Sequence, residues 1–335
     1  MKNALPEEFL FSHNYCFFIH DQLANIIVSG EKEGIFSDVR HEIKDSSHIA
    51  ELQGKSGIEL TEWMETNGYK DVLYFLYYKQ ICVALLTDLC HFVYEALNCS
   101  EKGKLTVTYA LLRKPLKDNL FYLEWLLADP CDFMGRFISS DPKKLQIDKI
   151  APERKKEIIT KAMNKTVREQ WIDPEFMYQL RFDKCADFGL EPMWQKANHL
   201  ITTINAYLKT EGQNFNFIFS DDDARMSQWK HLYSMLPFVL YQALLVIDAL
   251  VSNFAIRAKD NDMTDLRCNI GMLLWLRDGP WKRDMSEVQK IIAQSIANEN
   301  IDCPKCNNVF IFDEENQKLL YEEGILKCKE CRFSM

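Results

Sequence analysis

Glycine and proline are scarce in this chain, at 12 and 10 of 335 residues. Such a composition excludes collagen-like and low-complexity proteins and is unfavourable for turn-rich all-β folds. Aromatic residues are plentiful, with 21 Phe, 13 Tyr and 7 Trp, which is not typical of a disordered chain. We therefore expect a folded protein of two or three domains, or one large domain with an appendage.

An excess of positive charge is also lacking. The 40 Lys and Arg residues face 49 Asp and Glu residues, which gives a net charge of -9 and a pI of about 5.4. A protein that coats nucleic acid is usually basic, so a contact with RNA or DNA would need a local patch. The first residues, MKNALPEEFLF, do not resemble a secretory signal, and eleven cysteines without one favour a reducing compartment. We predict a cytoplasmic protein.

Long apolar runs free of charge are missing as well. Leu73–Leu97 and Leu232–Ile256 are long enough to cross a bilayer, but Lys79, Asp88 and Asp248 lie within them. A charge near the middle of a span costs several kcal/mol in lipid. We predict that both runs are buried core helices and that the protein has no membrane partner.

Helical periodicity dominates the chain as far as about residue 300. The expected helices span 6–28, 58–66, 69–98, 105–128, 151–171, 174–182, 192–208, about 221–259, 265–277 and 285–298. Pro115 predicts an interruption near Lys114. Residues 29–56 are expected to be largely irregular, and the alternating run 214–219 is expected to be a strand. The predicted fold class is mainly α: a multi-helix bundle over 1–299 with a small C-terminal β zinc ribbon over 300–335.

The strongest motif is a pair of Cys-x2-Cys turns near the C-terminus: Cys303 and Cys306, then Cys328 and Cys331 after 21 residues. Four thiolates at this spacing suit one structural Zn²⁺ per chain, because a closed tetrahedral site needs four soft ligands. The alternatives are four unrelated cysteines, an iron–sulfur site or a redox pair.

The segment around these cysteines resembles a zinc ribbon in its CPKC turn, the β-type run VFIF and the CKEC turn. That resemblance implies a contact with nucleic acid or with a protein. Seven acidic and five basic residues over 301–335 favour a stabilising or protein-docking role. The cluster Lys327, Lys329 and Arg332 is the plausible phosphate contact in this segment.

A second candidate for nucleic-acid binding is a basic helix. Residues 141–168 hold nine basic and four acidic residues, and Arg154, Lys161, Lys165 and Arg168 share one stripe of the expected helix. A stripe of this kind can follow a phosphate backbone. The alternative is a solvated helix face in an otherwise acidic protein.

Catalytic motifs are nearly absent, since the sequence contains no HExxH, GxSxG, P-loop or GxGxxG pattern. One spacing remains: Arg225 and His231 form R-x5-H, after an acidic run (221–223) that is expected to cap a helix rather than to bind a metal. The spacing resembles the R-x4-6-H motif of HEPN-type helical domains, many of which are RNases of bacterial toxin and phage-defence systems. The alternative is a surface arginine and a partly buried histidine.

The resemblance implies metal-independent RNA cleavage at a ribose 2′-hydroxyl, with His231 as general acid or base and Arg225 stabilising the developing charge. It also implies a homodimer. The helix around Arg113 and Glu124 looks similar to that of HEPN-like bacterial proteins, so the suspected core spans about 69–259. Arg113 and Glu124 are eleven apart, hence on one face, and are either structural or part of a site.

Two functions are therefore expected. The first is a nucleic-acid- or antiviral-defence-associated protein whose HEPN-like core cleaves RNA. The alternative is a non-enzymatic, protein-binding or regulatory scaffold whose ribbon docks a partner.

Overall fold

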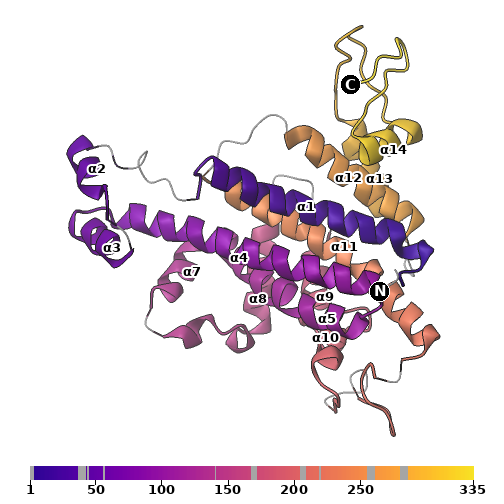
Figure 1. Cartoon of the computed structure of the whole chain (residues 1–335), viewed down its shortest axis with the longest axis horizontal. Helices are drawn as coiled ribbons and strands as arrows, with labels where there is room; N and C mark the ends of the chain where they lie inside the picture. Colours follow the sequence, from indigo (N-terminus) through magenta and orange to yellow (C-terminus); the bar gives the residue numbers. More distant parts are fainter. Residues whose placement is uncertain are drawn as a thin grey trace.

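The structure is a computed structural model, and it confirms the mainly helical fold. It describes residues 4–36, 43, 45–55, 57–139, 141–166, 172–203, 209–218, 220–254, 261–279 and 286–335. Three long helices form its centre, namely α1 (Leu10–Lys32), α4 (Lys70–Glu101) and α11 (Asp222–Ser252), and α1 packs against both of the others (Figure 1). The remaining helices cover this centre.

The two apolar runs are α4 and α11. By length and composition, each helix is able to cross a membrane. In α11, 78% of the most apolar window is buried inside the protein, as expected of a core helix. In α4 the buried share is 39%, and its first half extends past α1 towards α2 (Ser46–Leu52) and α3 (Gly57–Thr66), as Figure 1 shows.

A second group of helices covers one side of α4 and α11. Its members are α5 (Leu105–Arg113), η2 (Lys114–Asn119), α6 (Leu120–Ala128), α7 (Pro130–Phe137), η3 (Pro142–Leu145), η4 (Ile147–Lys149), α8 (Pro152–Asn164), α9 (Pro174–Phe182) and α10 (Leu190–Asn198). The interruption predicted near Lys114 is confirmed, since η2 is a π-helical segment with Pro115 in its first turn. Proline lacks the N–H that would continue the α-helical bonding there.

Other sequence-based boundaries need correction. The chain over 29–56 is not wholly irregular, because α1 continues to Lys32 and Asp45 caps the extra helix α2. The helix expected over 192–208 ends at Asn198. The strand expected over 214–219 is wrong for its described part, where residues 216–218 form a turn and Phe217 has φ +63°. Residue 219 lies outside the described residues.

The C-terminal part consists of α12 (Asn261–Asp278), α13 (Ser286–Ala297) and the two cysteine turns, with α14 (Glu314–Glu323) between the two turns. At the other end of the chain, a short helix, η1 (Glu7–Phe9), precedes α1. The expected β ribbon is not confirmed. Two isolated bridges, Asp302–Val309 and Lys327–Ser334, are the β pairing found over the described residues. The division at residue 300 stays a prediction.

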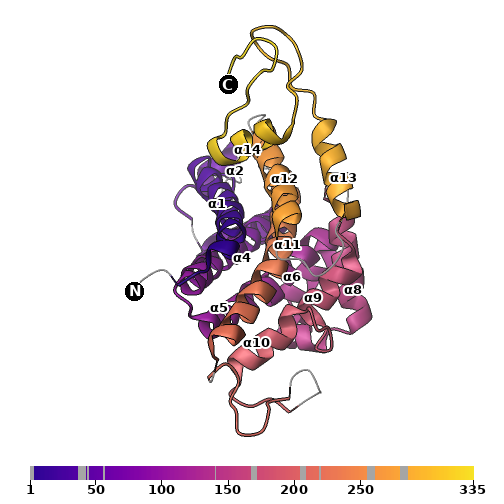
Figure 2. The same ribbon diagram turned by 90° about the vertical axis from the view of Figure 1, so that its right-hand side faces the viewer.

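Helix α14 fastens this C-terminal segment to the helical body. The Tyr321 ring lies 5.6 Å from the Phe11 ring and 5.5 Å from the Phe18 ring, both on α1, measured between centroids. Arg267 of α12 donates a hydrogen bond from Nη2 to the Tyr321 carbonyl at 2.8 Å. Figure 2 shows α14 at the end of α1 and α12, with the cysteine turns beyond it.

Gly271 makes this contact possible, and replacing it with alanine is expected to destabilise the protein. A Cβ at this position of α12 would lie 2.6 Å from ring atoms of both Tyr15 and Tyr321, so the rings would have to move. Overpacking of this kind costs about 1–3 kcal/mol. The measurement is the denaturant midpoint of Gly271→Ala.

Gly135→Ala is the matched control, because a Cβ there meets no atom within 4 Å and the residue lies in the helix α7. Alanine in place of an exposed helical glycine is expected to stabilise by roughly 0.5–1 kcal/mol. Equal midpoints for the two variants would contradict the close packing described for Gly271.

Candidate metal centre and other candidate sites

The two cysteine turns share one backbone geometry. The first cysteine of each turn donates its N–H to the carbonyl five residues later, at 2.8 Å in both Cys303 and Cys328. The fourth residue after each of these cysteines takes a left-handed conformation, with φ +56° at Asn307 and +58° at Arg332. Each turn is therefore closed by the same backbone hydrogen bond, and the sulfur atoms of one turn face those of the other turn.

The four sulfur atoms form one cluster. The Sγ atoms of Cys303 and Cys331 lie 3.6 Å apart, as do those of Cys306 and Cys328, and all four lie within 4.8 Å of one another. In a tetrahedral site with metal–sulfur bonds of about 2.3 Å, the sulfur atoms are ~3.8 Å apart. The cluster therefore has the size that one metal ion requires, with every ligand supplied by the protein.

The local backbone prepares at least one of these ligands for a metal. The N–H of Cys331 donates to the Cys328 sulfur, and this bond lowers the pKa of the Cys328 thiol to about 7. The thiolate is the metal-binding form, so this hydrogen bond favours the state of Cys328 that binds a metal.

Asn316 holds the two turns together, and its role was missed in the sequence. The side chain is fully buried in the first turn of α14, where Nδ2 donates to the carbonyls of Ile311 and Lys327 at 2.7 and 3.0 Å. Its Oδ1 accepts from the Lys327 N–H at 3.0 Å. The one available signal was its place three residues after Asp313, which caps α14.

The basic cluster of the second turn is largely paired. Lys329 contacts Asp313 at 2.9 Å and Glu315 at 2.6 Å, and Lys327 lies 3.7 Å from Glu315. These carboxylates compete with any phosphate for the same ammonium groups. The geometry is thus less suited to nucleic acid than the positions of these lysines in the sequence suggest.

The basic stripe of α8 is engaged in the same way. Arg154 contacts three carboxylates at 2.9–3.1 Å, and the bond with Glu157 raises the pKa of its guanidinium. Lys161 pairs with Glu157 at 2.7 Å, and Lys165 donates to two backbone carbonyls at the end of α6. Arg168 lies outside the described residues. Three basic side chains of the stripe, those of Arg154, Lys161 and Lys165, therefore already contact acceptor groups of the protein.

Arg225 and His231 both lie near the start of α11, as expected, but they have different partners. Arg225 forms an ion pair with Asp222 on the exposed first turn. His231 approaches the hydroxyl of Tyr109 with Nδ1 at 3.0 Å, while that hydroxyl donates to the Gln228 carbonyl at 2.9 Å. Positions six apart on a regular helix point about 120° away from each other. Their catalytic role stays a prediction.

Glu124 has a partner that the sequence did not indicate. Both of its oxygens accept from Nη2 of Arg181 at 2.7 Å, and both side chains are completely buried. Burial raises the pKa of Glu124, and the guanidinium counteracts that rise. Arg113 instead lies 3.9 Å from Asp118. A π-helical turn holds more residues than an α-helical turn, so η2 breaks the three-turn register assumed between Arg113 and Glu124.

A second buried ion pair adjoins the first. Lys117 of η2 contacts Glu191 of α10 at 2.7 Å, and both side chains are nearly inaccessible to solvent. Lys117 and Arg181 both lie over the ring of Phe182. The two pairs connect η2, α6, α9 and α10, which gives this polar cluster a structural role in joining those helices.

Comparison of the chain with family models, curated proteins and solved structures gave no match. The resemblance to HEPN-type domains therefore has no support beyond the residues that suggested it.

Proposed function

We propose that this protein is a non-enzymatic helical scaffold whose C-terminal segment is held by one structural zinc ion and docks a protein partner. The observation that carries the proposal is the closed cluster of Cys303, Cys306, Cys328 and Cys331, which leaves no coordination position for a substrate or water. Zinc suits four thiolates in a tetrahedron, and such sites stabilise folds rather than perform chemistry.

The proposed docking surface is the extended chain after the first cysteine turn. The side chains alternate there: Phe310 is buried, whereas Val309 and Ile311 are 47% and 55% exposed. Successive residues of an extended chain point to opposite sides, so these two share an outward face. Together with the paired lysines of the second turn, this apolar face favours a protein over a phosphate-bearing partner.

The test compares two doubly substituted, zinc-loaded proteins in a cross-linking capture from cells. Val309→Asp with Ile311→Asp is expected to lose a partner that the wild type retains. Val28→Asp with Ile58→Asp adds the same charge at two other exposed apolar positions and is expected to retain it. Light scattering shows whether the partner is a second copy of the chain. If the two double variants capture the same partner to the same extent, the surface around Val309 and Ile311 is not the docking surface.

We also propose, as the alternative function, the RNA cleavage associated with HEPN-type defence proteins, in a cytoplasmic setting. The supporting observation is the bond between His231 and Tyr109, because a general base is commonly oriented by such a third group. Arg225 is half-exposed, and a phosphate would have to displace Asp222 from it. A homodimer would add a second such pair.

Removing the imidazole of His231 is expected to reduce the rate of this cleavage strongly. The measurement is the decay of single-stranded RNA in magnesium-free buffer with the wild type and with His231→Ala, after the zinc content of both has been checked. Loss of a general acid or base costs about 10²–10⁴-fold in rate. Absence of cleavage by the wild-type protein, or equal cleavage by both, would remove this alternative.

A further inference from the structure

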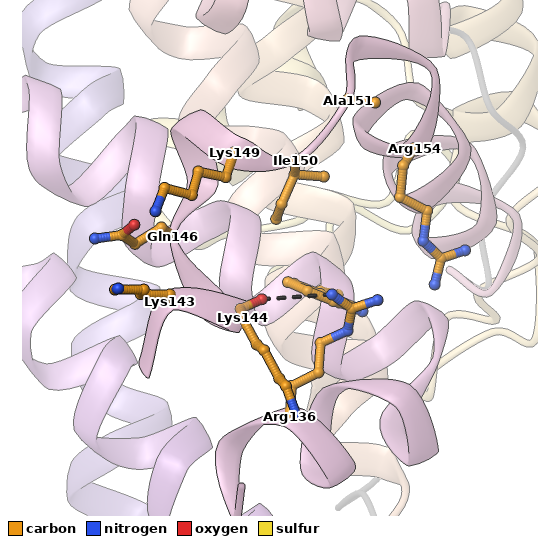
Figure 3. Close-up of a pocket in the computed structure, with 9 residues that line it drawn as sticks. Arg136, Lys143, Lys144, Gln146, Lys149, Ile150, Ala151 and Arg154 are labelled. Atoms are coloured by element: carbon orange, nitrogen blue, oxygen red, sulfur yellow. Dashed lines mark hydrogen bonds between the residues drawn. The ribbon is translucent and has the colours of Figure 1, made fainter. Parts of the chain in front are cut away.

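A small pocket lies where α7, η3, η4 and α8 meet, away from the cysteine cluster. It has a volume of about 250 Å³. Its wall holds five cationic side chains, from Arg136, Lys143, Lys144, Lys149 and Arg154, as Figure 3 shows. No carboxylate is present among the lining residues that the structure describes. This density of positive charge stands out in a protein whose net charge is -9.

The two arginines are held in place by acids that lie behind them. Asp132 accepts from Arg136 at 2.9 Å and from Arg154 at 3.0 Å. The Arg136 guanidinium also lies 5.1 Å from the centre of the Trp125 ring, and it contacts the Lys144 carbonyl at 3.4 Å, the dashed line in Figure 3. These contacts hold both arginines in place, and the carboxylates neutralise part of their positive charge.

The three lysines differ from the arginines. Lys143, Lys144 and Lys149 are all exposed, and none of them has a carboxylate within 4 Å over the residues that the structure describes. They stand on two short helical turns, η3 and η4, and all three residues line the pocket. A bound anion would reduce the repulsion between side chains of like charge.

Backbone N–H groups at the start of α8 add further hydrogen-bond donors to the pocket. Ala151, which precedes the first turn of this 13-residue helix, lines the pocket and has no side chain able to cap the helix. Pro152 lacks an N–H, so the next two backbone N–H groups are the donors of that turn. The positive end of the helix dipole favours an anion at this position.

We propose that this pocket binds the phosphate groups of a compact, multiply phosphorylated ligand. Its volume is below the 300–1,000 Å³ typical of pockets for drug-sized molecules, and it suits a di- or triphosphate group. The neighbouring stripe of α8 offers no continuation for a long strand, since Lys161 and Lys165 already have partners. The ligand is a free phosphorylated small molecule or the phosphorylated end of a nucleic acid. This proposal goes beyond the docking role proposed for the C-terminal segment and does not depend on it.

The test is an isothermal calorimetric titration of the full-length, zinc-loaded protein with inorganic triphosphate at low salt. The triple variant Lys143→Gln, Lys144→Gln, Lys149→Gln is expected to bind at least about tenfold more weakly, because it loses three charge-assisted contacts. It leaves Arg136 and Arg154, which support the local fold, unchanged. The control Lys102→Gln, Lys104→Gln, Lys209→Gln removes the same charge from exposed lysines of other segments and is expected to bind like the wild type.

A second arm separates the two sources of phosphate. Single-stranded RNA with a 5′-triphosphate is compared with the same RNA bearing a 5′-hydroxyl, and free triphosphate is used as competitor. Binding that requires the 5′-triphosphate and is competed by the free anion identifies a nucleic-acid end, whereas binding of the free anion alone identifies a small molecule. The proposal is overturned if the wild type does not bind triphosphate, or if both triple variants bind equally well.

Discussion

Replacing Cys303 with serine is expected to abolish metal binding and unfold the C-terminal segment. The Cys303 side chain is completely buried and its sulfur lies 3.6 Å from that of Cys331, so the variant lacks one corner of the cluster. Structural zinc sites contribute apparent binding free energies of about 10–16 kcal/mol at neutral pH in isolated peptides, and that energy is folding energy. The measurements are the zinc content per chain and amide hydrogen exchange over 301–335.

Cys131→Ser is the matched control, because Cys131 is an exposed free cysteine outside the cluster. It should keep about one zinc ion per chain and unchanged exchange protection. A Cys303→Ser protein that still holds a full equivalent of metal, with residues 301–335 as protected as in the wild type, would show that the four cysteines do not form the site described.

Removing one partner of the buried ion pair between Glu124 and Arg181 is expected to lower the free energy of unfolding substantially. In Glu124→Gln the guanidinium of Arg181 loses its counter-charge while remaining completely inaccessible to solvent. Breaking a buried pair in this way costs about 3–5 kcal/mol. The measurement is the free energy of unfolding from denaturant titration, compared between the variant and the wild type.

Two further variants distinguish the buried charge from a general loss of packing. Glu124→Leu combined with Arg181→Met removes both charges and is expected to be far less destabilising than Glu124→Gln. Glu287→Gln breaks the exposed pair with Lys290 and is expected to cost under ~1 kcal/mol. A Glu124→Gln protein as stable as Glu287→Gln would contradict the buried ion pair.

The elements that the sequence predicts well are those specified locally. The cap at Asp221, whose Oδ1 accepts from the Ala224 N–H at 2.8 Å, and the interruption at Pro115 depend on residues within one turn of each other. The spacing of the four cysteines is equally local within each turn, and the tetrahedral geometry that four thiolate ligands require predicts that the two turns face each other. These features could be derived without any tertiary structure.

The features that the sequence did not reveal depend on distant residues. Glu124 and Arg181 are 57 positions apart, and no periodicity relates them. The cationic side chains of the pocket come from four separate elements, and the charge excess over 141–168 contained all of them except Arg136 but did not indicate that they line one pocket. The alternation over 214–219 predicted a strand wrongly, because a β pattern needs a partner to pair with and Phe217 instead enters a left-handed turn.

The docking of α14 onto α1 has a consequence for synthesis of the chain. The Tyr15 hydroxyl donates to the Cys268 carbonyl 253 residues later, and Tyr321, which packs beside Tyr15, is made later still. At about 5–20 residues per second, Tyr321 is synthesised ~15–60 s after Tyr15. The side of α1 that packs against α12 and α14 is therefore left uncovered by these two helices through most of translation.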